Sequence, residues 1–297
     1  MDRIDAMRAF VAVADLNGFA PAARKLGLSP SNVTRLIAAL EGRLGARLLQ
    51  RTTRQVALTD AGARYLERAR RIVSDVEEAE SAAEGERITP GGRLVVSAPN
   101  GFGRLHVSPV MSGYLKRYPD VSADLRLSDR VINLVEDGVD LAVRIGHLPD
   151  STLVARQVGR MRRIVVASPD YLKRRGEPKA PSALASHDTI QFGAMTAAPD
   201  WRFVENGREV RVAIAPRFST NSADAAIQHA EQGGGLTRVL AYQAAGSLKA
   251  RRLRIVLATF EPPALPIHIV YPTSRLLSAK VRTFVDLVTE TADWRFG

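Results

Sequence analysis

Residues 19–62 read FAPAARKLGLSPSNVTRLIAALEGRLGARLLQRTTRQVALTDAG, and their spacing predicts two short helices joined by a tight turn. Apolar residues recur at helical spacing in the first helix, and Gly27 suits the position just past its C-terminus. Ser29 is a favourable N-cap for the second helix. Pro30 suits the first position of that helix, because the N–H that proline lacks is unpaired there in any helix. The pattern is therefore typical of a helix-turn-helix.

The second helix is expected to bury one face and expose the other. The buried face consists of Val33, Leu36, Ile37, Leu40 and Leu44. The opposite face carries small side chains and a single arginine, so it can approach base edges closely. Arginine can bond guanine with both arms, and small hydroxyls can reach bases or phosphates. We therefore predict that this helix binds DNA through Ser29, Ser31, Asn32, Thr34 and Arg35.

Residues 48–58 change period and are expected to form two short strands around a polar turn. A basic hairpin beside a recognition helix is a wing, and its predicted contacts to phosphate or the minor groove are Arg51, Thr53 and Arg54. Between Arg24 and Arg54 seven basic side chains stand against one acid, Glu41, which suits a polyanionic partner. A solvated surface is the alternative for any single arginine. The agreement of turn chemistry, spacing and charge favours a DNA-binding face.

The resemblance to a known family starts at MRAFVAVA (residues 7–14) and runs through LTDAG (58–62). This segment resembles the winged helix-turn-helix of LysR-type transcriptional regulators. Further along, RLVVS (93–97), DRVINLVEDGVDLAVRIG (129–146) and LPIHIVYP (265–272) are similar to the effector-binding domain of that family. One departure concerns Pro30 and Ser31, where many members have Gln-Pro. The base contact of that glutamine is therefore absent, and the contact is assigned instead to Ser31, Thr34 and Arg35.

The resemblance implies a sequence-specific regulator of transcription and not an enzyme. Its implied partners are double-stranded promoter DNA, a small-molecule effector, RNA polymerase and further copies of the chain, as a homodimer and homotetramer. It also implies a fold of three parts: a winged helix-turn-helix at 1–58, a linker helix and hinge at 59–87, and a two-lobed α/β effector-binding domain at 88–297 that resembles periplasmic binding proteins. Lobe I would comprise about 88–162 and 268–297, and lobe II about 163–267.

Residues 59–83 are predicted to form one long helix, which Thr59 can cap. Apolar residues follow one another in alternating steps of four and three, the a/d repeat of a coiled coil. We predict that this seam pairs two copies of the chain through Tyr65, Ala69, Ile72, Val76 and Ala79. The alternative is that the seam lies on the core of its own chain. Acidic residues, glycines and a proline in 84–92 then predict a hinge.

The remainder of the chain alternates strands and helices, which is typical of an α/β domain. Strands are predicted at 94–98, 121–127, 141–145, 163–167, 189–192, 202–204, 210–214 and 267–271, and helices at 103–116, 131–136, 223–232 and 279–291.

The loops that follow strands in such a domain are the expected walls of a ligand cleft. The predicted effector-binding residues are Ser97, Pro99, Asn100, Gly101, Phe102, Ser128, Arg144, Asn221 and Ser222. Helix capping is an equal alternative for Asn221 and Ser222, and Arg144 could instead pair with an acid in its own lobe. Of the net charge of +11, +9 lies after residue 87, and this basic C-terminal part favours either an anionic effector or simply a soluble surface.

Catalytic and metal-binding motifs are not found in the sequence, and no cofactor is predicted. Gly101 and Gly103 follow a strand, but position 106 is His106, so the dinucleotide fingerprint fails. The five histidines lack ligand spacing, and the chain has no cysteine. No signal peptide or membrane-length apolar run is seen, so a cytoplasmic protein without a membrane partner is expected. The alternatives are a solute-binding sensor without DNA binding and an enzyme that uses the cleft.

Overall fold

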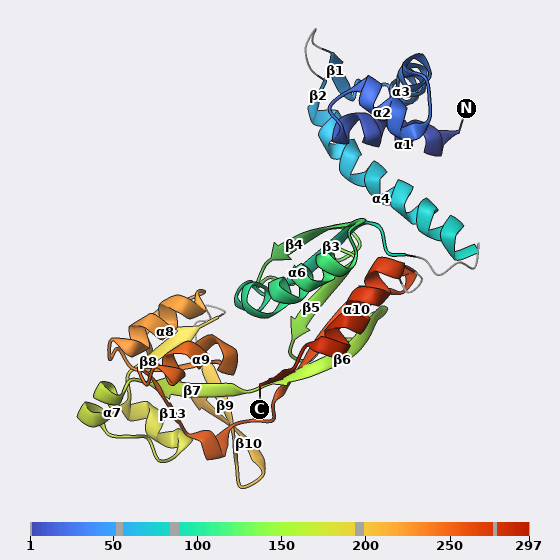
Figure 1. The fold of residues 1–297 in the computed structure, drawn as a ribbon. Coiled ribbons are helices and arrows are strands. Elements are labelled where there is room, and N and C mark those ends of the chain that lie inside the picture. The colour runs from blue at the N-terminus through green and yellow to red at the C-terminus, as the bar shows by residue number, and fades with distance from the viewer. Residues whose placement is uncertain (1, 52–55, 84–88, 194–198, 276–277, 297) are drawn as a thin grey trace. The chain divides into compact units, whose positions relative to one another are not determined.

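The computed structural model describes residues 2–51, 56–83, 89–193, 199–275 and 278–296. Two compact units are formed, one within residues 1–92 and one within residues 93–297 (Figure 1). The predicted fold class, a small helical domain with a β wing, a long helix and an α/β domain, is confirmed.

The first unit is a three-helix domain with a hairpin and a long helix. Its elements are α1 (Arg3–Asp15), α2 (Phe19–Leu26), α3 (Pro30–Leu44), β1 (Leu49–Arg51), β2 (Val56–Leu58) and α4 (Asp60–Ala83). Gly27 and Gly45 end α2 and α3 in the left-handed conformation, at φ +66° and +64°. Phe10, Val33 and Ile37 are fully buried in the core between the helices. The local signals of the sequence therefore give the correct order and bounds of these elements.

Helix α4 packs along α1 within this unit. Leu66 and Ala69 are buried in the same core as Phe10. Ion pairs continue the contact, because Arg70 of α4 bonds Asp15 of α1. Arg8 of α1 also lies 2.9 Å from a carboxylate oxygen of Glu80 in α4. The inner face of α4 is therefore committed to its own protomer.

The second unit contains two sheets. The first has six strands in the order β15 (Trp294–Phe296), β6 (Leu153–Met161), β14 (Leu265–Pro272), β5 (Leu141–Ile145), β3 (Gly92–Ala98) and β4 (Val121–Leu127). Its helices are α5 (Asn100–Phe102), a π-helical turn (Gly103–Val107), α6 (Ser108–Arg117) and α10 (Ala279–Thr291). Phe102, Tyr114 and Phe284 of these helices are fully buried in one core with the strands. We call this part lobe I.

The second sheet, in lobe II, has five strands in the order β11 (Pro216–Thr220), β8 (Thr189–Phe192), β12 (Leu236–Leu240), β7 (Arg163–Ala167) and β13 (Arg254–Val256). Around it lie α7 (Pro169–Arg175), α8 (Ala223–Glu231), α9 (Ala241–Lys249) and the hairpin of β9 (Asp200–Glu205) with β10 (Arg208–Ala213). The chain crosses between the lobes twice, once before β7 and once before β14. Arg162 beside the first crossing donates two hydrogen bonds, of 2.9 and 3.0 Å, to the carboxylate of Glu261 beside the second.

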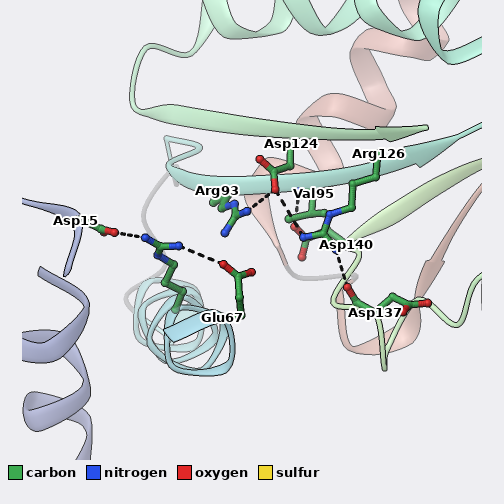
Figure 2. A network of polar contacts seen from close by, with 9 residues as sticks. Asp15, Glu67, Arg93, Val95, Asp124, Arg126, Asp137 and Asp140 are labelled. Atoms are coloured by element: carbon green, nitrogen blue, oxygen red, sulfur yellow. Dashed lines mark hydrogen bonds and ion pairs between the residues drawn. The ribbon is translucent and has the colours of Figure 1, made fainter. Parts of the chain in front are cut away.

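An ionic network fixes the β3–β4–β5 side of lobe I (Figure 2). Arg93 bonds Asp124, and Arg126 lies 3.6 Å from the same carboxylate. Asp140 is buried, accepts a 2.8 Å hydrogen bond from the Val95 N–H and lies 3.3 Å from Nε of Arg275. The Asp140 carboxylate therefore has a structural role at the start of β5.

The predicted helix over 131–136 is wrong, because the segment forms turns. The side-chain oxygen of Asn133 accepts hydrogen bonds from the N–H groups of Val135 and Glu136, at 3.2 and 3.4 Å. This local side chain to backbone bonding competes with helix formation. Leu134 is buried, whereas Val131 and Val135 are 90% and 64% exposed, so only part of the apolar pattern is packed against the domain, too little to stabilise so short a helix.

The other predicted strands and helices are present, with one refinement. The helix over 103–116 begins with a π-helical turn before α6. Strands β6, β11, β12, β13 and β15 and helices α7 and α9 were not expected from the sequence.

Candidate DNA-binding face and effector cavity

The N-terminus of α3 is organised by its own polar side chains. The Oγ of Ser29 accepts a 3.2 Å hydrogen bond from the Asn32 N–H, which confirms Ser29 as the N-cap. Ser31 Oγ lies 3.0 Å from Ser29 Oγ, and Arg35 donates a 2.8 Å hydrogen bond to Oδ1 of Asn32. Ser31 and Arg35 are exposed, and Asn32 and Thr34 are half-buried. The residues predicted to bind DNA on this helix thus form one accessible surface.

The wing is attached to α3 through the single acid of the basic stretch. Glu41 accepts hydrogen bonds from the N–H groups of Leu48 and Leu49, at 2.7 and 3.0 Å. The carboxylate of Glu41 is therefore bound to the backbone at the start of the hairpin. This structural role explains why an acidic residue occurs in a segment that is otherwise basic and suited to phosphate. Thr53, Arg54 and the Arg51 side chain lie outside the part of the chain that is described. The predicted contacts of the wing tip stay predictions.

The seam predicted for dimerisation is divided between two environments. Ala69 is fully buried in the core of its own unit, so the prediction is wrong for that residue. Tyr65 is half-buried, with its ring centroid 5.7 Å from that of Phe10. Ile72, by contrast, is 40% exposed, and Val76 is half-buried. The physical reason is that α4 lies along α1 and turns the first part of the seam inward; the Ala79 side chain lies outside the described part.

A cavity of about 410 Å³ lies between the lobes of the second unit. Lobe I contributes the ends of β3, β4 and β5, and lobe II contributes parts of β7, β8, β12 and the start of α9. The lining residues are Pro99, Ser128, Asp129, Arg130, Val131, Arg144, Ile145, Arg163, Phe192, Gly193, Arg238, Val239, Leu240, Tyr242 and Gln243.

Three of the predicted effector-binding residues, Pro99, Ser128 and Arg144, line this cavity. Four others, Ser97, Asn100, Gly101 and Phe102, are not among its lining residues. Ser97 and Phe102 are fully buried. The side chain and backbone N–H of Asn100 bond the carboxylate of Asp129, at 2.8 and 3.0 Å.

Gly101 supports the cavity by being small. A Cβ at this position would lie 3.1 Å from the hydroxyl of Tyr242, so glycine lets that ring approach. Asn221 and Ser222 are exposed and do not line the cavity. Ser222 caps α8 by accepting a 3.3 Å hydrogen bond from the Ala225 N–H, so capping is the role the structure supports.

The cavity residues that sequence reasoning missed come mainly from lobe II. Arg163 begins β7, Arg238 lies within β12, and Tyr242 and Gln243 open α9. Strand pairing places Leu240 opposite Arg163 and Val165 opposite Arg238, so the two arginines share a face of the sheet. The sequence predicted a strand that begins at Arg163. It did not predict β12 or the register that places Arg238 beside Arg163.

The arginines of the cavity are held in low-polarity surroundings. Burial lowers the pKa of Arg144 and Arg163, and the second is lowered further by the nearby charge of Arg202. Burial, and then the charge of Arg163, lower the pKa of Arg238 to about 10. Arg238 also donates to the backbone oxygens of Arg202 and Asp200, at 3.3 Å each. These shifts show that the cations are desolvated at positions facing one cavity.

No helix within the described ranges is both long and apolar enough to cross a membrane. Within the same ranges, no cluster of three or more side chains of the kinds that bind metals is found.

Comparison with known proteins agrees with both parts of this architecture. Residues 4–63 match the family model described as bacterial regulatory helix-turn-helix protein, lysR family, and residues 88–293 match the LysR substrate binding domain. An HTH-type transcriptional regulator of Xanthomonas campestris is 37% identical over 94% of this chain and 82% of its own length. An HTH-type transcriptional repressor of Pseudomonas aeruginosa is 35% identical over 98% and 92%.

A solved structure leads to the same family. The LysR-type transcriptional regulator CrgA from Neisseria meningitidis is 30% identical and has a TM-score of 0.61, with 96% of this chain and 97% of that one covered. Both domains and nearly the full length therefore match, and the chain belongs to the LysR family of transcriptional regulators.

Proposed function

We propose that this LysR-type regulator binds promoter DNA as a homo-oligomer through the exposed face of α3 and the wing. We further propose that a small anionic effector, bound in the cavity between the lobes, changes how the protein acts on DNA. The proposal contains no catalytic step. The proposal is supported by the presence, in one chain, of an accessible α3 surface in the first unit and an arginine-lined cavity in the second.

The arrangement at α3 supports base contacts by Arg35. Asn32 accepts one of the hydrogen bonds of its guanidinium at 2.8 Å, which restricts the side chain before DNA arrives. Restricting a flexible side chain in advance reduces the entropy lost on binding. Ser31 is exposed on the same surface and can reach phosphate or a base edge.

The self-association part rests on α4. Ile72 leaves a large apolar side chain 40% exposed, beside the face of the helix that packs against α1. Burying such a residue against a second copy would remove apolar surface from water. Twofold pairing would also present the α3 surface twice and set the spacing of the DNA half-sites.

The DNA-binding part can be tested by selecting duplexes from a random library with the full-length protein. We expect a defined motif with two related half-sites, and binding that weakens steeply as salt increases. Recovery of no motif, with only weak binding to all duplexes in dilute salt, would support a solute-binding sensor and contradict the proposal.

A further inference from the structure

We propose that the effector of this regulator is a small dicarboxylate. One carboxylate would bind Arg144 of lobe I, and the other would bind Arg163 and Arg238 of lobe II. This inference rests on the proposed function in taking the cavity between the lobes as the effector site, and it adds the chemical class of the ligand.

The lobe II side of the cavity concentrates positive charge on one face of a sheet. Arg163 and Arg238 lie on adjacent strands and on the same face, in the register that pairs Leu240 with Arg163. Each is largely removed from water, and the charge of Arg163 is one of the causes that lower the pKa of Arg238. Two like charges held together in this way favour an anion between them.

Arg238 is oriented before any ligand binds. Its guanidinium donates to the backbone oxygens of Arg202 and Asp200 and lies 5.6 Å from the ring centroid of Trp201. A guanidinium fixed by carbonyl oxygens and an aromatic ring keeps its full charge while losing rotational freedom. The remaining N–H groups suit the planar, two-oxygen geometry of a carboxylate.

The lobe I side contributes Arg144, and the exposed Arg130 and the carboxylate of Asp129 also line the cavity there. Arg144 lies on β5, opposite His268 of β14, and is half-buried. Two acids of lobe I, Asp140 and Asp129, bind other groups. Asp140 binds the Val95 N–H and Arg275, and Asp129 binds Asn100. The alternative that Arg144 pairs with an acid of its own lobe is therefore not realised in the described part of the chain.

Among the described residues Arg144, Arg163 and Arg238 form no ion pair, although the nearby charge of Asp200 opposes the larger effect of burial on the pKa of Arg238. Residues 194–198, which follow the lining residue Gly193, read AMTAA and contain no acid. A partly buried charge without a counterion raises the free energy of the folded protein. An anion that neutralises such charges therefore binds more favourably than it would at an exposed site. A single carboxylate can neutralise one side of the cavity, whereas both sides require two anionic groups.

The cavity also has an apolar part, besides polar lining residues such as Ser128, Asp129 and Gln243. Ile145, Phe192, Val239 and Leu240 line it, with the ring of Tyr242. This surface suits a hydrocarbon or aromatic body that separates two carboxylates. A cavity of about 410 Å³ has room for a ligand with a body of several carbon atoms.

The test is calorimetric titration of the full-length protein with matched acids. The dicarboxylates are succinate, glutarate, adipate and phthalate, and the matched monocarboxylates are butyrate, hexanoate and benzoate. We expect at least one dicarboxylate to bind roughly tenfold or more tightly than its matched monocarboxylate, the difference expected for one additional charge-assisted contact. Arg144→Gln, and separately Arg163→Gln, should abolish that advantage, and Arg144→Lys should restore part of it.

The matched control is Arg208→Gln, which removes an exposed arginine of the β9–β10 hairpin and should leave the affinity unchanged. Circular dichroism and thermal melting of each variant establish that it is folded. Equal affinity of dicarboxylates and monocarboxylates would overturn the proposal. So would dicarboxylate binding that survives Arg144→Gln, or no binding of any dicarboxylate at millimolar concentration.

Duplex binding, measured on the same preparations, separates this inference from the proposed function. A protein that selects a DNA motif but binds no dicarboxylate is a regulator with another class of effector. A protein that binds dicarboxylates but no DNA contradicts the proposed regulator and leaves the assignment of the ligand intact.

Discussion

At the scale of single residues, the arginines of the cavity illustrate how residues suited to binding can lower the stability of the folded protein. Arg163 is desolvated, lies near Arg202 and Arg238, and has no counterion among the described residues. Its charged form is therefore less favourable in the folded chain than in the unfolded chain. The proposed role of Arg163 in binding the ligand would therefore come at a cost in stability.

Arg163→Gln should therefore raise the melting temperature of the ligand-free protein while removing ligand affinity. A gain of roughly 1 kcal/mol corresponds to a rise of about 2–4 °C for a domain of this size. Differential scanning calorimetry without any added acid measures it. A lower melting temperature would indicate that the guanidinium makes stabilising contacts, contrary to this interpretation.

His106 offers a second prediction at this scale, through pH. It lies in an aromatic cluster, with ring centroids 4.9 Å from Phe102 and 4.8 Å from Phe296, and burial lowers its pKa below the usual 6.5. As the pH falls below about 6.5, the unfolded chain takes up a proton that the folded chain does not. Folding stability should therefore decrease with falling pH in this range.

In His106→Phe the decrease in melting temperature from about pH 7 to pH 5 should be smaller, because one lowered histidine pKa is removed. Part of the decrease should remain, since burial also lowers the pKa of His187 and His268. His147→Gln is the control, because His147 is exposed. An unchanged slope in His106→Phe would show that His106 is not held neutral by the fold.

Single residues also show where sequence reasoning succeeds. Ser29, Gly27 and Gly45 were predictable because caps depend on chemistry within a few residues of the chain. Arg163 and Arg238 were not predictable as neighbours, because their proximity depends on a register between strands that are about seventy residues apart.

At the scale of elements, the attachment of the wing to α4 depends on a close backbone approach. A Cβ on Gly62 would lie 2.0 Å from the backbone oxygen of Leu48. Thr59 holds the same junction by donating to the Arg47 oxygen and accepting from the Gly62 N–H, at 2.7 and 2.9 Å. Neither partner of the clash is a flexible side chain, so the backbone itself would have to move.

Gly62→Ala should therefore lower the free energy of unfolding by about 1–3 kcal/mol, the usual cost of overpacking. Gly42→Ala is the matched control, because Gly42 lies in α3 with open space around it. That variant should raise the free energy of unfolding by about 0.5–1 kcal/mol through helix propensity. Urea unfolding measures both, and equal stabilities would contradict the close approach at Gly62.

The secondary-structure elements also differ in how well they could be predicted from the sequence. Helices α3, α4 and α10 have long periodic patterns, and their bounds follow. The segment 131–136 has a helical pattern of apolar residues, but Asn133 bonds the backbone locally, and Val131 and Val135 of that pattern remain exposed. Strand β12 is short and contains Thr237 and Arg238, so it lacks the apolar run that marks a buried strand.

At the scale of the whole molecule, the proposed self-association would use the exposed face of α4 that carries Ile72. Ile72→Asp should weaken it, because a charge would replace exposed apolar surface at the proposed interface. We expect the dissociation constant of the dimer to increase at least about tenfold, measured by sedimentation velocity. Ala63→Asp, on the opposite side of the helix, is the control. Equal dissociation constants would place the dimer interface elsewhere.

The order of the parts was readable from the sequence, because the helix-turn-helix signals are local and strong. The cavity was readable only in part. Pro99, Ser128 and Arg144 follow predicted strands of lobe I, whereas Arg163, Phe192 and Tyr242 reach it from segments of lobe II that pair only in the folded chain. Long-range pairing of this kind leaves no periodic trace in a single sequence.

The central claim is that the exposed face of α3 reads DNA. The measurement that tests it most directly is a fluorescence titration of the selected duplex and a scrambled duplex, over a series of salt concentrations, with the wild type, Arg35→Ala and Arg208→Ala. The claim predicts that Arg35→Ala loses about 1–3 kcal/mol of discrimination between the two duplexes, while Arg208→Ala behaves as the wild type. Full discrimination by Arg35→Ala, with the salt dependence unchanged, would contradict it.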